Sequence, residues 1–170
     1  MKNTKGIIIA VVLLIAAVAA FVLIKPKQPT AKGWPQVYFY DMGKGETYVG
    51  PKNQIPPTQA PGGQGEAVWA AVYSCGDCAD VSTHKVAYLE KFSPEAKGYL
   101  ESAMATIGNS TRPEYQQPFA NIPVGQELVA SVDEPNTWLD KNAEGATIVR
   151  DGMASICDGQ QAKMCTPPAK

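Results

Sequence analysis

Basic side chains are scarce in most of this chain. From residue 33 onward there are 10 lysines and arginines against 16 aspartates and glutamates, a formal charge of −6. Proteins that bind DNA or RNA present clustered lysines and arginines to the phosphates, and the sequence has no such cluster. We therefore expect no nucleic-acid partner, and no attraction between the body of the domain and anionic lipid.

Several catalytic signatures are also absent. The sequence contains no G-x-S-x-G, no phosphate-binding glycine loop and no H-E-x-x-H, which are the motifs of α/β-hydrolases, P-loop NTPases and zinc proteases. The stretch DMGKGE, residues 41–46, lacks the alternating oxygen ligands of a calcium loop, so it predicts a turn. These absences favour a protein that is not an enzyme.

One long apolar run is present near the N-terminus. Residues 6–24, GIIIAVVLLIAAVAAFVLI, are 19 apolar residues without a charge, and a helix of that length spans the roughly 30 Å core of a bilayer. We predict a short tail (1–5), a transmembrane helix (6–24), a tether (25–33) and one domain (34–170). A cleaved signal peptide is the alternative, because AVA at 17–19 resembles a cleavage site, but the apolar run continues past it.

The sequence gives a weaker indication of how this segment is oriented across the membrane. Lysines flank both ends of the run, so the positive-inside rule gives nearly balanced flanks. A very short N-terminus before an apolar segment is typical of a signal-anchor, which translocates the polypeptide on its C-terminal side. We expect a single-pass membrane protein with an extracytoplasmic domain and the lipid bilayer as the partner of residues 6–24.

The remaining residues predict a small α+β domain of hairpins, short strands and two helices, since strands and helices do not alternate as in βαβ units. Strand-forming residues on either side of MGKG predict a hairpin over 37–49, and residues 67–74 and 127–132 predict further strands. Residues 83–92 fit a strand or a helix, and residues 109–126 are predicted to be irregular.

Two helices are expected in this domain. Ser93 begins the first as its cap, and apolar residues from Ala96 to Ile107, Tyr99 included, recur on one helical face. The second follows Asn142, although Gly145 and Gly152 weaken that prediction. Its inward residues are expected to be Ile148, Val149, Met153 and Ile156. The hairpin aromatics Tyr38, Phe39, Tyr40 and Tyr48 suit a core better than a binding face.

The four cysteines, Cys75, Cys78, Cys157 and Cys165, form a C-x2-C pair and a distant C-x7-C pair. A structural zinc ion needs four tetrahedral ligands, and C-x2-C brings two thiolates onto one ion from a tight turn. The second pair is wider than a usual zinc knuckle. We predict a zinc site with all four cysteines as ligands, in a zinc-ribbon-like cluster.

Two other interpretations of the cysteines stay open. An extracytoplasmic domain with an even number of cysteines is expected to form disulfides, and four cysteines allow three pairings. Alternatively Cys75 and Cys78 form a catalytic dithiol, since a strand before C-x-x-C is typical of thioredoxin-like proteins, but Asp77 would raise the thiol pKa. The single histidine, His84, is either a fourth ligand, a base for Cys78 or an ordinary surface residue.

Four segments carry a resemblance that spans most of the domain. They are VYFYDMGKGETYVGPKNQIPP, VYSCGDCAD, YLEKFSPEAK and the C-terminal C-x7-C-T-P. In this order they resemble a set of uncharacterised, singly membrane-anchored proteins of planctomycete-type bacteria. The resemblance brings no activity or catalytic residue with it, but it implies that the two cysteine pairs form one shared site.

The function expected from the sequence is therefore that of a membrane-anchored binding or assembly module of the cell envelope, with a protein partner in the envelope. The four cysteines would serve as a structural site. The alternative is a membrane-tethered thiol-disulfide oxidoreductase that uses Cys75 and Cys78.

Overall fold

The computed structural model describes residues 34–63, 65–107, 112–157 and 161–167. The predicted tail (1–5), transmembrane helix (6–24) and tether (25–33) lie outside these residues. Within the described residues, no helix has the length and apolarity needed to cross a membrane.

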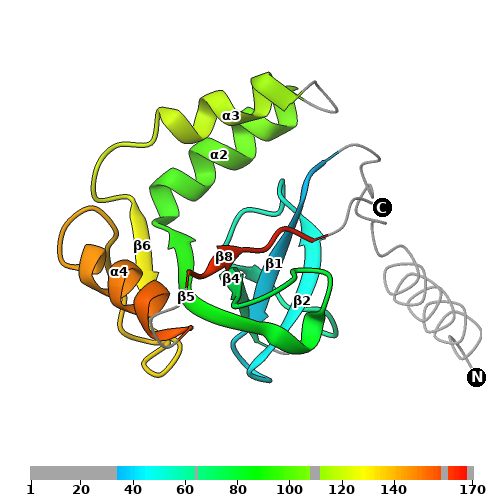
Figure 1. Ribbon diagram of the computed structural model, residues 1–170. Helices are drawn as coiled ribbons and strands as arrows, with labels where there is room; N and C mark the ends of the chain where they lie inside the picture. Colours follow the sequence, from blue (N-terminus) through cyan, green and yellow to red (C-terminus); the bar gives the residue numbers. More distant parts are fainter. Residues whose placement is uncertain (1–33, 64, 108–111, 158–160, 168–170) are drawn as a thin grey trace, which may run out of the picture. The chain divides into compact units, whose positions relative to one another are not determined.

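An eight-stranded antiparallel sheet organises the described part of the chain (Figure 1). Six strands form its main path, in the order β2 (Glu46–Pro51), β1 (Gln36–Asp41), β4 (Glu66–Ser74), β5 (His84–Phe92), β6 (Glu127–Ala130) and β7 (Leu139–Asp140). Two short strands, β3 (Thr58–Gln59) and β8 (Lys163–Met164), both pair with β4. The long central strands β4 and β5 therefore position the helices and the cysteine loop.

The hairpin predicted around MGKG is confirmed as β1 and β2, which pair from Gln36 and Pro51 to Asp41 and Glu46. The buried Asp41 carboxylate holds the turn by accepting hydrogen bonds from the backbone N–H groups of Gly43 (2.9 Å) and Lys44 (3.1 Å). A short acidic side chain that bonds to the backbone two residues ahead is a common way to fix a turn. DMGKGE is thus a turn, as predicted.

One of the four hairpin aromatics, Phe39, lies in the core as expected, whereas Tyr38, Tyr40 and Tyr48 are half-buried. Phe39 is completely buried, and the Tyr48 ring stacks on it with 5.3 Å between centroids. Stacked aromatic pairs of this kind stabilise a fold beyond the area they bury.

Three helices lie in the described residues, one more than predicted: α2 (Pro94–Ile107), α3 (Arg112–Ala120) and α4 (Gly145–Ser155). Ser93 caps α2, since its Oγ accepts a hydrogen bond from the N–H of Ala96 at 3.2 Å. Ala96, Leu100 and Met104 are buried as the periodicity predicted, but Tyr99 is 46 % exposed, so its inward placement was wrong. The predicted inward residues of α4 all pack against the core.

Helix α3 occupies the segment predicted to be irregular. Its sequence, RPEYQQPFA, contains two prolines and shows no apolar periodicity. Pro118 lies inside the helix, where proline removes a backbone hydrogen bond. The helix packs against α2 and places Phe119 against Trp69 of the sheet, so tertiary contacts outweigh an unfavourable local sequence.

The two faces of the sheet are covered differently. Because side chains alternate along a strand, Val68 and Trp69 of β4 point to opposite faces. One face carries Trp69, Ala71 and Tyr73 and receives α3 and α4. The other face buries Val68, Leu89 and Ala130 against loop residues that include Trp138, with no helix from the described part of the chain. Helices on one side of an antiparallel sheet confirm the α+β class.

Candidate functional site

The C-x2-C segment lies in the loop that joins β4 to β5. Ser74, the last residue of β4, is fully buried, and its Oγ lies 2.6 Å from the Thr83 Oγ1 across the loop. The same Oγ accepts a hydrogen bond from the N–H of Gly76 at 3.0 Å. Thr83 Oγ1 also donates to the carbonyl of Asp80 at 2.8 Å. These hydrogen bonds hold the loop in place independently of its cysteine side chains.

Each cysteine of this loop is bonded to a cysteine near the C-terminus. Cys75 forms a disulfide with Cys157, with 5.3 Å between Cα atoms, and Cys78 forms one with Cys165, with 5.4 Å. The paired residues are 82 and 87 positions apart in the sequence. The cross-pairing that ties the C-terminus to the central strands is therefore the one that the fold adopts, and all four cysteines are consumed.

The zinc prediction for these cysteines is wrong. A tetrahedral site of four cysteines needs four thiolates around one ion, whereas these sulfurs are bonded in two pairs. No group of three or more His, Cys, Asp or Glu side chains that could hold a metal occurs among the described residues. The sequence spacing was compatible with both chemistries, and the cross-pairing of the two clusters was one of the disulfide arrangements that it left open.

The second disulfide is supported by backbone pairing. Strand β8 runs antiparallel to the end of β4, with Lys163 opposite Ser74 and Met164 opposite Tyr73. The N–H of Cys165 donates to the carbonyl of Val72 at 2.9 Å. The C-terminal segment is thus held to the central strand by both hydrogen bonds and a covalent bond.

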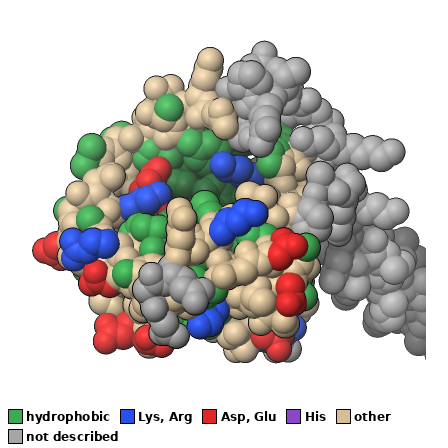
Figure 2. Space-filling model, in the orientation of Figure 1, with side chains coloured by type: hydrophobic (Ala, Val, Ile, Leu, Met, Phe, Trp, Pro, Cys, Tyr) green, Lys and Arg blue, Asp and Glu red, His purple; other side chains and the backbone are tan. Residues whose placement is uncertain are grey.

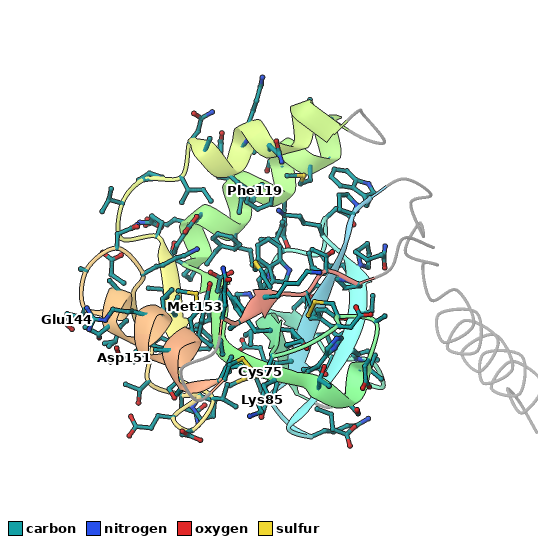
Figure 3. The ribbon with its side chains drawn as sticks, in the orientation of Figure 1. Cys75, Lys85, Phe119, Glu144, Asp151 and Met153 are labelled. Carbon is teal, nitrogen blue, oxygen red and sulfur yellow. A yellow bond between two sulfur atoms is a disulfide. The ribbon has the colours of Figure 1, made fainter. Side chains whose placement is uncertain are left out.

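His84 and Lys85 hold the same region from β5. His84 Nε2 lies 3.0 Å from the carbonyl oxygen of Cys78, and its ring meets Tyr38 edge to face at 5.6 Å. Lys85 Nζ donates to the carbonyl of Ile156 at 2.9 Å, at the C-terminal end of α4, where a cation complements the helix dipole. Figure 3 shows Lys85 beside Cys75. The His84 side chain therefore contacts the backbone of the cysteine loop and serves as a structural residue.

A second candidate site lies between the helices and the sheet. Figure 2 shows hydrophobic side chains lining a hollow on this face, with charged side chains at its edges. Three rings meet here: the Trp69 ring lies 5.3 Å from Phe92 and 5.7 Å from Phe119, and these two lie 6.0 Å apart. Phe119, labelled in Figure 3, comes from the end of α3. We call these three residues and Lys52 the aromatic hollow.

Two hydrogen-bond donors accompany these rings. Lys52 Nζ lies 5.1 Å from the Phe119 centroid and 5.8 Å from that of Trp69, within the range of a cation–π contact. The backbone of Lys52 is anchored by a hydrogen bond from its N–H to the carbonyl of Pro35 at 2.8 Å. Trp69 is nine-tenths buried, and its Nε1–H has no acceptor among the described residues. A buried donor without an acceptor costs about 1–3 kcal/mol.

The acidic groups of this face are already engaged. Glu90 stands opposite Trp69 in the sheet, and its carboxylate lies 2.7 Å from Lys141 Nζ, which also lies 3.3 Å from Glu127. Burial alone would lower the pKa of Lys141, but its attraction and hydrogen bonds to Glu90 and Glu127 together raise it. The ammonium is therefore firmly held by two carboxylates.

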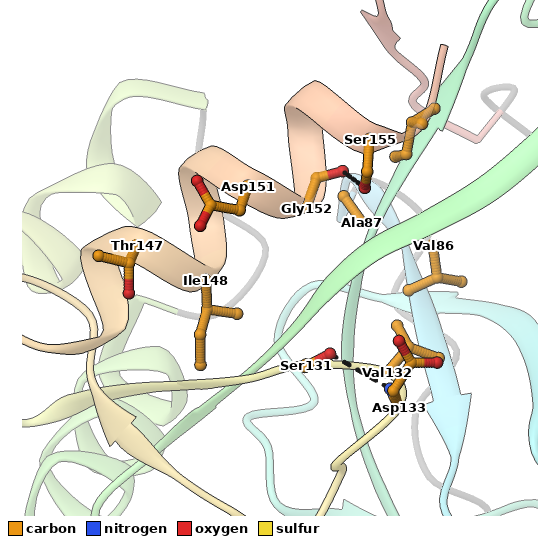
Figure 4. A pocket seen from close by; sticks show the side chains of 11 residues that line it. Val86, Ala87, Ser131, Val132, Asp133, Thr147, Ile148, Asp151, Gly152 and Ser155 are labelled. Carbon is orange, nitrogen blue, oxygen red and sulfur yellow. Dashed lines mark hydrogen bonds between the residues drawn. The ribbon is translucent and has the colours of Figure 1, made fainter. Parts of the chain in front are cut away.

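A groove along α4 is a further depression on the domain (Figure 4). Its volume is about 530 Å³, and β5, β6 with the residues after it, and α4 form its walls. Three of its polar side chains bond to neighbours: Ser155 to the carbonyl of Gly152, Thr147 to that of Glu144, and Asp151 to Arg150 at 3.1 Å. This groove thus differs from the aromatic hollow, where a buried donor lacks an acceptor.

The chain matches no family model, no curated protein and no solved structure.

No sequence pattern pointed to the aromatic hollow. Lys52, Trp69, Phe92 and Phe119 come from four separate segments, and Phe119 lies in the stretch predicted to be irregular. Trp69 belongs to a strand that was predicted to be buried, which it is. That its indole N–H would lack an acceptor depends on which groups surround it, and the strand pattern does not encode this.

Proposed function

We propose that this chain is a membrane-anchored, extracytoplasmic binding module that holds an apolar small molecule in the aromatic hollow. The apolar run at residues 6–24 supports the anchor. The two disulfides support an extracytoplasmic location, since such bonds persist in oxidising compartments. In this proposal the two disulfides stabilise the fold.

The observation that carries the proposal is the buried indole of Trp69, whose donor has no acceptor among the described residues, within a cluster of three aromatic rings. Ligand sites are mostly apolar and aromatic, with a few polar groups that orient the ligand. An unsatisfied buried donor is costly unless it is used. The three rings supply the apolar wall that such a site needs.

The pairing of the cysteines favours this function over that of a thiol-disulfide oxidoreductase. Such an enzyme exchanges electrons through a dithiol whose two cysteines bond to each other. Here Cys75 and Cys78 each bond to a partner more than 80 residues away. No observation in the described residues favours redox catalysis as a second candidate.

The test uses the full chain in lipid nanodiscs with its three tryptophans replaced by 5-fluorotryptophan. Each tryptophan then gives its own ¹⁹F resonance, so Trp69 reports on the hollow while Trp138, on the opposite face of the sheet, is an internal control. We expect 1-octanol to shift the Trp69 resonance saturably and to leave that of Trp138 unchanged. A parallel, non-saturating drift of both signals would indicate lipid partitioning and overturn the proposal.

A matched pair of variants tests the location. Phe119→Ala removes one wall of the hollow and is expected to weaken binding at least about tenfold, since an aromatic wall contributes more than about 1.4 kcal/mol of contact. Val124→Ala, at a position that is 80 % exposed, is expected to leave binding unchanged. Equal effects of the two substitutions would show that the ligand binds elsewhere.

A further inference from the structure

We propose that the groove along α4 is a second ligand site, which takes a small organic amine with an ammonium on a short apolar body. This site is separate from the aromatic hollow, and it does not depend on the function proposed there. Its volume of about 530 Å³ lies in the range of small-molecule sites. The class of ligand follows from the apolar floor of the groove, the hydrogen bonds of its rim and the charges around it.

Helix α4 presents two parallel stripes of residues to the groove, because residues four positions apart lie one above the other on a helix. The polar stripe is Thr147, Asp151 and Ser155, and the apolar stripe is Ile148, Gly152 and Ile156. The polar stripe is exposed, whereas the apolar stripe is half-buried or buried. Gly152 lies against the backbone of Ala87, and Ile148 points from α4 toward the segment that carries Ser131 (Figure 4). The helix side of the groove is thus apolar next to the sheet and polar along its outer edge.

The hydroxyl groups of the polar stripe offer acceptors to a ligand. Thr147 Oγ1 donates its proton to the carbonyl of Glu144 at 2.8 Å, and Ser155 Oγ donates to that of Gly152 at 3.2 Å. A hydroxyl has a single proton, so once that proton is engaged only its lone pairs remain for a ligand. A ligand that carries N–H donors is therefore complementary to this stripe.

Both charged side chains that line the groove are carboxylates. Asp151 lies on α4, and Asp133 lies after β6 on the opposite wall (Figure 4). The backbone N–H of Asp133 donates to Ser131 Oγ at 3.3 Å, and its side chain is exposed. Within the described ranges, the Asp133 carboxylate has no ion-pair or hydrogen-bond partner. This carboxylate is therefore open to a cationic ligand.

Arg150 and Lys85 lie near the groove, and neither is paired with Asp133. Arg150 contacts Asp151 at 3.1 Å, but the two side chains are 70 % and 69 % exposed, and exposed ion pairs contribute little. Lys85 donates to the carbonyl of Ile156 at 2.9 Å and does not line the groove. An amine in the groove would therefore meet two carboxylates, whereas an anion would be repelled by them.

The experiment compares three probes of similar size: phenethylammonium, phenethyl alcohol and phenylacetate. The full chain is labelled with ¹³C at the isoleucine δ1 methyl groups and held in zwitterionic nanodiscs. Ile148 reports on the groove, and Ile55, which is 2 % exposed and lies outside the groove, is the internal control. We expect phenethylammonium to shift the Ile148 signal saturably and to bind at least about tenfold more tightly than the alcohol, as a charge-assisted hydrogen bond predicts. Phenylacetate should bind more weakly than the alcohol.

Two acidic positions form the matched control. Asp133→Asn removes the unpaired charge at nearly constant size and should remove most of the preference for phenethylammonium over the alcohol. Asp133→Glu keeps the charge and should retain the preference. Glu66→Gln removes a negative charge at the exposed start of β4, outside the groove, and should change nothing at Ile148. An unchanged Ile55 signal shows that each variant is folded.

Equal affinity for phenethylammonium and phenethyl alcohol, or an equal loss in Asp133→Asn and Glu66→Gln, would overturn this proposal. A parallel, non-saturating drift of the Ile148 and Ile55 signals would also overturn it, since it indicates partitioning into lipid. Binding in the aromatic hollow is measured at Trp69 in a separate titration, so failure at one site leaves the other standing.

Discussion

Gly152 lies directly against the backbone of Ala87, because α4 crosses β5 at this point. A β-carbon at position 152 would overlap the carbonyl oxygen of Ala87 and would lie 3.1 Å from its carbonyl carbon. Gly145, at the first turn of the same helix, approaches the Val129 side chain and the carbonyl of Asp140 in the same way. The two glycines thus allow the helix to lie close on the sheet.

Gly152→Ala is therefore expected to destabilise the domain by about 2 kcal/mol or more, because the clash is with backbone and cannot be relieved by a side-chain rotation. Urea denaturation of the full chain in detergent micelles, followed by near-UV circular dichroism, measures this effect. Gly98→Ala is the matched control, since a β-carbon in the middle of α2 would meet nothing within 4 Å. That substitution should be neutral or stabilise by up to about 1 kcal/mol, as helix propensity predicts. Equal effects of the two would contradict the close approach.

The disulfide pairing predicts a specific peptide map. Cleavage before Asp77 separates Cys75 from Cys78, and cleavage before Asp158 separates Cys157 from Cys165. A protease that cuts before aspartate, used without reductant, should therefore give one cross-linked species for Cys75 and Cys157 and another for Cys78 and Cys165. Thiol titration of the denatured, unreduced protein should find no free thiol. Stoichiometric zinc, or local pairs within each cluster, would be inconsistent with the structure.

The two disulfides should contribute non-additively to stability. Either bridge alone closes a loop of more than 80 residues and is worth about 4.5 kcal/mol in the chain-entropy model. With one bridge in place, the other closes a ring of only about a dozen residues and adds about 3 kcal/mol. We expect either cysteine pair, replaced by alanine, to cost about 3 kcal/mol, and the fourfold variant to cost more than twice as much. Strict additivity in the same denaturation assay would argue against the paired topology.

The buried hydroxyl of Tyr88 predicts sensitivity to alkaline pH. Burial, and after it the Glu90 carboxylate and Tyr73, raise the pKa of Tyr88 above its ordinary value near 10. In the unfolded chain this tyrosine loses its proton near pH 10, whereas in the folded chain it retains it. The stability that the neutral hydroxyl contributes is therefore present below pH 10 and lost above it, by at most about 1.4 kcal/mol per pH unit.

Tyr88→Phe should flatten the decline in unfolding free energy between about pH 10 and 11.5. Tyr99→Phe, which alters an exposed tyrosine of α2, should keep the wild-type slope. If both variants decline as the wild type does, the alkaline transition belongs to another group.

Local signals explain why several elements could be predicted from the sequence. The hairpin follows from alternation around turn glycines, and α2 follows from the cap at Ser93 and the apolar repeat after it. In contrast, the prolines of α3 argue against a helix, and the glycines of α4 weakened its prediction although they are what allow it to pack. A close approach between two backbones depends on the tertiary structure, so the sequence alone does not show that a glycine within a helical pattern is needed for packing.

The candidate site was predictable only in part for a similar reason. The family resemblance implied that Cys75 and Cys78 share one site with Cys157 and Cys165, but the spacing left zinc, a dithiol and three disulfide pairings open. The aromatic hollow could not be predicted from the sequence, because its residues come together only when β2, β4, β5 and α3 are assembled.

The cross-paired disulfides also affect what proteolysis does to this domain. Both bridges begin before residue 79 and end at or after residue 157. A single cut anywhere between Cys78 and Cys157 therefore leaves two fragments joined by two covalent bonds. Trp69 in one fragment and a C-terminal piece in the other stay in one molecule until a reductant is added, so a nicked domain is retained as a unit rather than lost in parts.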